Sequence, residues 1–258
     1  MTWRIALPAV TRWPSRALLA ASLAGWVLLP LLGHGAQSSA ALCLSYPTLA
    51  DAPRGALAAL SVADDTMLAA LSWIVMVVAM MSPLLAQPIV QLRLRSLTRR
   101  RRRAVALFAA GYLAIWIVAG FALVTASAAI TRLAEHLGWP ALAITLTIAA
   151  IWQAAPLRQS ALNRCHRPPD LSAFGLAADL DCFGFGLTHG VWCVVTCTPW
   201  MLLPLTTPAF HLPLMLMISI ALLLERIAPA RPAAWTWRIL PGQKVAGVLL
   251  RSMQWSVR

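Results

Sequence analysis

The fold of this chain is decided by the stretch Arg93-Leu94-Arg95-Ser96-Leu97-Thr98-Arg99-Arg100-Arg101-Arg102-Arg103. This stretch contains seven of the 21 basic residues and lies directly between two long apolar segments. Basic runs also occur in nucleic-acid-binding patches, but no basic domain surrounds this one. Because short, positively charged loops stay on the cytoplasmic side of a membrane, the stretch predicts a cytoplasmic loop between two membrane-spanning helices. It predicts no nucleic-acid partner.

The composition around this loop is that of a membrane protein. Of the 258 residues, 60% are hydrophobic and 11% are charged, and the formal net charge is +13. A soluble domain has about 25% charged residues and fewer than half apolar ones. Such an excess of apolar side chains exceeds what one globular core can bury. A bilayer is therefore the expected surrounding, and a helix satisfies its own backbone hydrogen bonds there.

Six apolar segments are candidates for helices that cross the bilayer, which takes about 20 residues each. They cover residues 17–32, 67–90, 104–130, 139–157, 183–203 and 209–226. The sequence thus predicts an all-α, polytopic bundle of six transmembrane helices in the bacterial inner membrane, with both termini in the cytoplasm. The first segment is short and polar residues follow it, so a cleaved signal peptide is the alternative. That alternative leaves five helices in the mature chain.

The distribution of cations supports this topology. It places 19 of the 21 basic residues on the cytoplasmic side and leaves only Arg54 and Arg132 in outer loops. Three regions follow from it. They are an N-terminal membrane helix or signal peptide with an outer loop (1–66), a five-helix membrane core (67–229) and a basic cytoplasmic tail (230–258).

Soft metal ligands recur in the fifth apolar segment. His189, Cys193, Cys197 and Met201 follow one another at intervals of four residues, which places the first three on one stripe of a helix. An imidazole, two thiols and a thioether are suited to Cu(I) or Zn(II) rather than to Mg or Ca. Cysteine and methionine also serve as ordinary packing residues, whereas a histidine inside a membrane points to function.

Other segments contribute candidates at a similar depth. Met80 and Met81 lie midway along the second segment, and Glu225 lies near the inner end of the sixth. A buried carboxylate needs a partner, and His189, Arg226 or a bound cation would serve. Pairing of Glu225 with an arginine at the membrane interface is the equal alternative.

The third segment contains small residues that can let a neighbouring helix approach closely. These are Gly111, Ala119 and Gly120. Close approach at small residues is typical of helix packing in membranes.

Four motifs resemble one bacterial family, described as predicted metal-binding integral membrane proteins (domain of unknown function family 2182). The motifs are Ala79-Met80-Met81-Ser82-Pro83, Trp152-Gln153-Ala154-Ala155-Pro156-Leu157-Arg158, Cys165-His166-Arg167-Pro168 and His189-Gly190-x-x-Cys193 through Cys197 to Met201, with Glu225 downstream. The resemblance covers Met67 to Pro229 and implies a metal site. The residues it carries over are Met80, Met81, His189, Cys193, Cys197, Met201 and Glu225. Where that family has a cysteine pair followed by tryptophan, this chain has Thr196, Cys197 and Thr198.

Three functions are compatible with these residues. The first is binding, delivery or transport of a soft metal ion, copper being favoured, with a metal-delivery or membrane-complex protein as partner. The second is a non-catalytic scaffold or assembly subunit, in which the polar residues only hold helices together. The third is a thiol oxidoreductase, although Cys193 and Cys197 lack the Cys-x-x-Cys spacing of such enzymes. Walker-type, His-Glu-x-x-His and Gly-x-Ser-x-Gly motifs are absent, so the sequence does not predict an enzyme.

Overall fold

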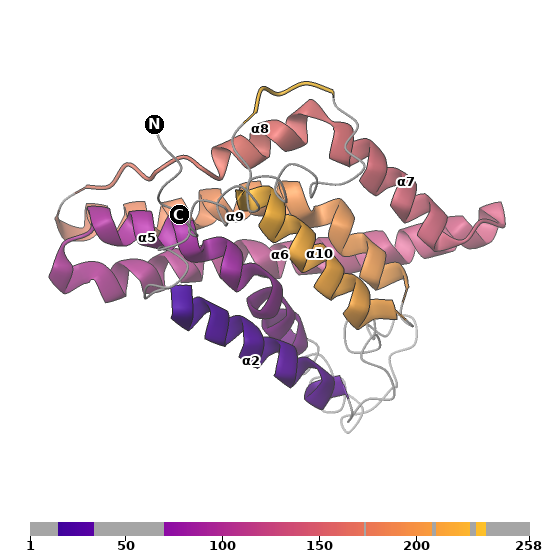
Figure 1. Ribbon diagram of the computed structural model, residues 1–258, viewed down its shortest axis with the longest axis horizontal. Coiled ribbons are helices and arrows are strands. Elements are labelled where there is room, and N and C mark those ends of the chain that lie inside the picture. The colour runs from indigo at the N-terminus through magenta and orange to yellow at the C-terminus, as the bar shows by residue number, and fades with distance from the viewer. Residues whose placement is uncertain (1–14, 34–69, 173, 208–209, 228–230, 236–258) are drawn as a thin grey trace, which may run out of the picture.

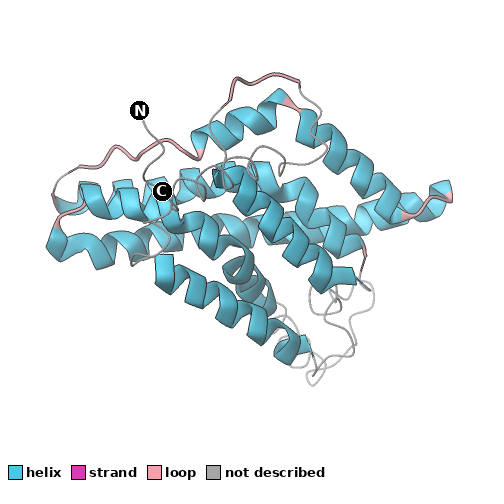
Figure 2. Ribbon diagram, viewed as in Figure 1, coloured by secondary structure: helices cyan, strands magenta, loops and turns pink. Residues whose placement is uncertain are grey.

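The computed structural model describes residues 15–33, 70–172, 174–207, 210–227 and 231–235, and within these ranges the chain forms helices and connecting loops without a β-strand (Figure 2). The predicted all-α fold is confirmed. Besides the helical residues 70–81, the elements are α2 (Ser15–Gly33), η1 (Ser82–Leu85), α5 (Ala86–Arg95), η2 (Thr98–Arg100), α6 (Arg101–Leu137), α7 (Ala141–Ala154), α8 (Pro156–Arg164), α9 (Gly175–Thr206) and α10 (His211–Ile227).

Helices α6 and α9 form the centre of the molecule and run side by side along its long axis (Figure 1). Glycine makes their close approach possible. A Cβ atom at Gly111 would lie 2.5 Å from the carbonyl oxygen of Phe183, and one at Gly186 would meet the backbone of Phe108. A Cβ at Gly120 would lie 2.7 Å from the ring of Trp73. The close approach predicted at Gly111 and Gly120 is therefore confirmed.

Among the residues that the structure describes, three helical stretches are long and apolar enough to cross a membrane, namely Ala70–Arg95, Thr98–Leu137 and Gly175–Thr206. A fourth crossing exists if α7 and α8, which are bent by 67° relative to each other, count as one broken span. Helix α10 has 17 residues and the apolar part of α2 covers Arg16–Pro30. The number six and the position of the termini therefore stay predictions. The outer loop before residue 70, most of the tail and signal-peptide cleavage concern residues that the structure does not describe.

Several helix ends differ from the predicted spans. α6 extends to Leu137 and α9 begins at Gly175, so part of the expected cytoplasmic segment between Arg158 and Asp181 is helical. The break between α7 and α8 has a local cause. Ala155 is extended at ψ 136° because a residue before proline avoids the helical region, and Pro156 then begins the next helix, a position that suits proline.

The arginine-rich stretch ties three elements together at one end of the bundle. Arg100 and Arg103 each bind Asp179 at 2.6 Å, which connects the start of α6 to the start of α9. Arg95 donates to the carbonyl oxygen of Pro169 at 2.5 Å and lies 3.9 Å from Asp170. The loop between α8 and α9 is thereby held against the end of α5.

Candidate functional site

Two thiols on α9 form the centre of the candidate site. Cys193 and Cys197 are one helical turn apart, their Sγ atoms are 4.0 Å apart, and both side chains are buried, at 0% and 1% exposure. Both are free thiols. Cys193 lies near the middle of α9, so the pair would lie deep in the bilayer if α9 crosses it.

Two side chains from other helices converge on Cys193. The hydroxyl of Tyr112, on α6, donates to its Sγ at 3.2 Å. The guanidinium of Arg226, at the end of α10, donates to the same sulfur at 3.6 Å. Both side chains are buried, so the Cys193 sulfur is surrounded by a hydroxyl donor, a cation and a second thiol.

His189 lies one turn before Cys193 on α9. Its ring packs among the aromatic rings of Phe108, Phe185 and Tyr112, with ring centroids 5.8, 5.8 and 6.1 Å away. The side chain is buried, and its Nε2 atom has no hydrogen-bond partner. A buried polar atom without a partner is costly, and Nε2 is thus the atom of His189 that is available to bind a ligand.

Thioethers lie in the same hydrophobic core as the thiol pair. Met80 and Met81 from the helix before η1, and Met201 from α9, are each 1% exposed and belong to the core cluster that contains both cysteines. Two further methionines join them, Met76 from the same helix as Met80 and Met215 from α10. The predicted methionines and cysteines thus share one buried core, to which the helix before η1 and α9 contribute them.

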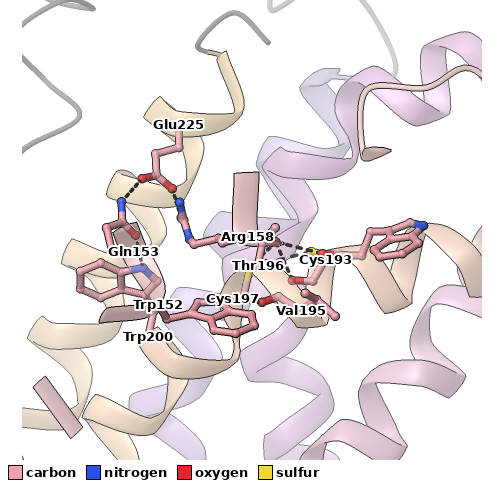
Figure 3. A network of polar contacts seen from close by, with 10 residues as sticks. Trp152, Gln153, Arg158, Cys193, Val195, Thr196, Cys197, Trp200 and Glu225 are labelled. Carbon is pink, nitrogen blue, oxygen red and sulfur yellow. Dashed lines mark hydrogen bonds and ion pairs between the residues drawn. The ribbon is translucent and has the colours of Figure 1, made fainter. Parts of the chain in front are cut away.

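Glu225 is engaged in a separate polar network (Figure 3). It accepts a hydrogen bond from Gln153 at 2.5 Å and forms an ion pair with the buried Arg158. Gln153 in turn accepts from Trp200 at 3.0 Å. The carboxylate therefore has its partners on α7 and α8, and His189, one of the partners considered from the sequence, lies instead among the aromatic rings described above.

The described part of the chain contains no group of three or more His, Cys, Asp or Glu side chains placed to hold one metal ion. Cys165, at the end of α8, is a further buried thiol next to Arg226. Burial of Cys165 raises the pKa of its thiol above the ordinary value. The candidate site therefore has two neighbouring thiols, Cys193 and Cys197, rather than a set of three or more His, Cys, Asp or Glu ligands.

Sequence reasoning gave no role to Tyr112 and did not foresee the contact of Arg226 with a thiol. Each lies on a different helix from the thiols, and only the packing of α6 and α10 against α9 brings them to Cys193. Arg158 was placed in a cytoplasmic segment, yet it is 1% exposed. The one available signal was its position directly after an apolar segment that contains Gln153.

Fold and site together define the class: a helical protein with several helices fit to cross a membrane and a buried core of thiols and thioethers. A family model described as "PpoB2: Copper chaperone" matches residues 70–250. This match covers more than half of the chain, and the chain belongs to that family. No curated protein and no solved structure matches the chain.

Proposed function

We propose that this protein is a copper chaperone of the bacterial inner membrane, which binds Cu(I) between Cys193 and Cys197 and passes it to a partner protein. The observation that carries the proposal is the buried pair of thiols, 4.0 Å apart, within a core that also holds five methionines. Thiolate and thioether ligands select Cu(I). The family description supports copper as the cargo.

The separation of the two sulfurs suits a shared metal ion. With metal–thiolate bonds of about 2.3 Å, as in zinc sites, two sulfurs 4.0 Å apart subtend an angle of roughly 120° at the metal. An angle of that size leaves room for a third ligand. Met201 is one turn further along α9, and Met80 and Met81 line the same core, so a thioether is the ligand we assign to that position.

Charge balance explains the presence of Arg226. Two thiolates and one Cu(I) carry a net charge of −1, and an unpaired charge is costly in a buried site. The guanidinium of Arg226, 3.6 Å from Cys193, supplies the compensating positive charge. Tyr112, 3.2 Å from the same sulfur, donates a hydrogen bond that also favours the thiolate.

Glu225 has a structural role in this proposal. Its carboxylate is already held by Arg158 and Gln153, and it connects α10 to α7 and α8. This network is the specific observation that favours helix assembly as a second function of the polar residues. It also fixes the end of α10 and with it Arg226.

Copper stoichiometry tests the proposal. The full-length chain, purified in detergent and loaded with Cu(I), is expected to bind one equivalent, and the double variant Cys193→Ser/Cys197→Ser is expected to bind almost none. Cys182→Ser is the matched control, because Cys182 is another buried free thiol on α9. Equal, substoichiometric copper in all three proteins would refute the proposal.

A further inference from the structure

An open cavity of about 630 Å³ lies beside the N-terminal half of α9. Its wall includes Arg164 and Arg167 from α8 and the following loop, Gly184 and Thr188 from α9, and His189. The volume falls within the range of about 300–1,000 Å³ that small-ligand sites occupy. The proposed function assigns no role to this cavity.

His189 connects the cavity to the thiol pair. It lines the cavity, yet it is 3% exposed, and its Nε2 atom has no hydrogen-bond partner. Side chains four residues apart on a helix are neighbours, with Cβ atoms about 5–6 Å apart. The side chain of Cys193 is therefore the next one after His189 on this face of α9. Tyr112 touches both, through its ring at His189 and its hydroxyl at Cys193.

The cavity has a defined wall and a defined location in the bundle. The guanidinium of Arg164 stacks on the ring of Trp192, 4.3 Å from its centroid, and both residues line the cavity. Asp170 and Asp181 also line it, so their two negative charges offset the two positive charges of Arg164 and Arg167. Arg95 holds the loop that carries Asp170, so the cavity lies near the arginine-rich end of the bundle.

We infer that this cavity is the port through which Cu(I) enters and leaves, with His189 as the ligand that receives the ion before Cys193. The inference rests on the proposed function, since it concerns the path of the same cargo. Imidazole suits this step because it binds copper as a neutral ligand. A single imidazole at the port binds the ion transiently, and from there the ion can move inward to the thiols or outward to a partner protein.

The rate of copper transfer tests the port separately from the copper site. The full-length chain is mixed with the Cu(I)–bicinchoninate complex, and loss of the complex's colour is followed by stopped flow. Gly184→Trp is designed to fill the cavity, because a Cβ at Gly184 meets nothing within 4 Å. Val191→Trp is the matched control, since Val191 is 41% exposed on the same helix and does not line the cavity.

We expect Gly184→Trp to slow loading at least tenfold while the final copper stoichiometry equals that of the unmodified chain, and Val191→Trp to load at the unmodified rate. His189→Ala should also slow loading, and His189→Met, which restores a soft ligand, should recover most of the rate. If Gly184→Trp proves unfolded by circular dichroism, Thr188→Trp replaces it, because Thr188 is exposed in the same wall.

Two results would overturn the port. One is loading of the filled variant at the unmodified rate, and the other is equal slowing of Gly184→Trp and Val191→Trp. In both cases a normal final stoichiometry would leave the proposed copper site standing. If the unmodified chain takes up no copper, the proposed function fails and the port fails with it.

Discussion

Arg226 places a positive charge beside Cys193, the sulfur proposed to bind Cu(I). Its contributions to stability and to Cu(I) affinity can be measured separately. Its Nη1 atom is buried without a hydrogen-bond partner. Replacing Arg226 by Met should make the copper-free protein no less stable, because a costly buried polar group is removed. The same change should weaken Cu(I) binding at least about tenfold, since a hydrogen bond to a charged group contributes about 1.5–3 kcal/mol.

A competition titration against a Cu(I) chelator measures this affinity, and Arg226→Lys is the control that keeps the charge. The Cu(I) affinity of Arg226→Lys should lie between the affinities of the unmodified chain and of Arg226→Met. Unchanged affinity in the Met variant would contradict the charge-balance argument.

Glu225 offers a second test at this scale. Removing one partner of a buried ion pair costs about 3–5 kcal/mol, and Arg158 and Glu225 are both buried. Glu225→Gln should therefore lower the melting temperature in detergent while the copper stoichiometry stays unchanged. Asp170→Asn is the control, because the pair of Asp170 with Arg95 is exposed and such pairs contribute about 0–1 kcal/mol.

A different outcome would give Glu225 another role. Loss of copper from Glu225→Gln at an unchanged melting temperature would make Glu225 a metal ligand, as the sequence had suggested.

Sequence periodicity could place His189, Cys193 and Cys197 on one stripe, because a single helix determines that stripe. The partners of Cys193 and Glu225 depend on packing between helices, which no local pattern records.

At the scale of helices, the contact between α6 and α9 depends on glycine. Gly186→Val should destabilise the protein by about 1–3 kcal/mol, the usual cost of overpacking a buried contact, because its side chain would meet the backbone of Phe108. Gly184→Ala is the matched control, since nothing lies within 4 Å of a Cβ there. It should leave stability unchanged or raise it by up to about 1 kcal/mol, because Ala is the better helix former.

Thermal unfolding in detergent, followed by circular dichroism, distinguishes the two variants. An equal change in thermal stability in the two variants would mean that the α6–α9 contact is looser than the structure has it.

The length of the apolar segments predicted where these helices lie in the sequence, but not where they end. The break before Pro156 follows from a local backbone preference, whereas the first turns of α9 are tied to α6 by the ion pairs of Asp179 with Arg100 and Arg103.

For the whole molecule, the length of α6 has a consequence. Its 37 residues span about 55 Å at about 1.5 Å per residue, whereas the hydrocarbon layer is about 30 Å thick. Both ends of α6 should therefore project into water, on opposite sides of the membrane. By the positive-inside rule, the arginine-rich end is the cytoplasmic one.

Cysteine labelling in cells tests this orientation. In a Cys43→Ser background, a membrane-impermeant maleimide should label Trp139→Cys in intact spheroplasts and Leu97→Cys only after the membrane is permeabilised. Leu97 and Trp139 are both exposed and flank α6. Labelling of both positions from the same side would contradict a single crossing by α6.

The central claim, that Cys193 and Cys197 together hold Cu(I), is tested most directly by copper K-edge X-ray absorption on the copper-loaded full-length chain. The account predicts a first coordination shell of sulfur, and loss of bound copper from Cys193→Ser/Cys197→Ser but not from Cys182→Ser. A shell of nitrogen or oxygen that stays the same in the double variant would contradict it.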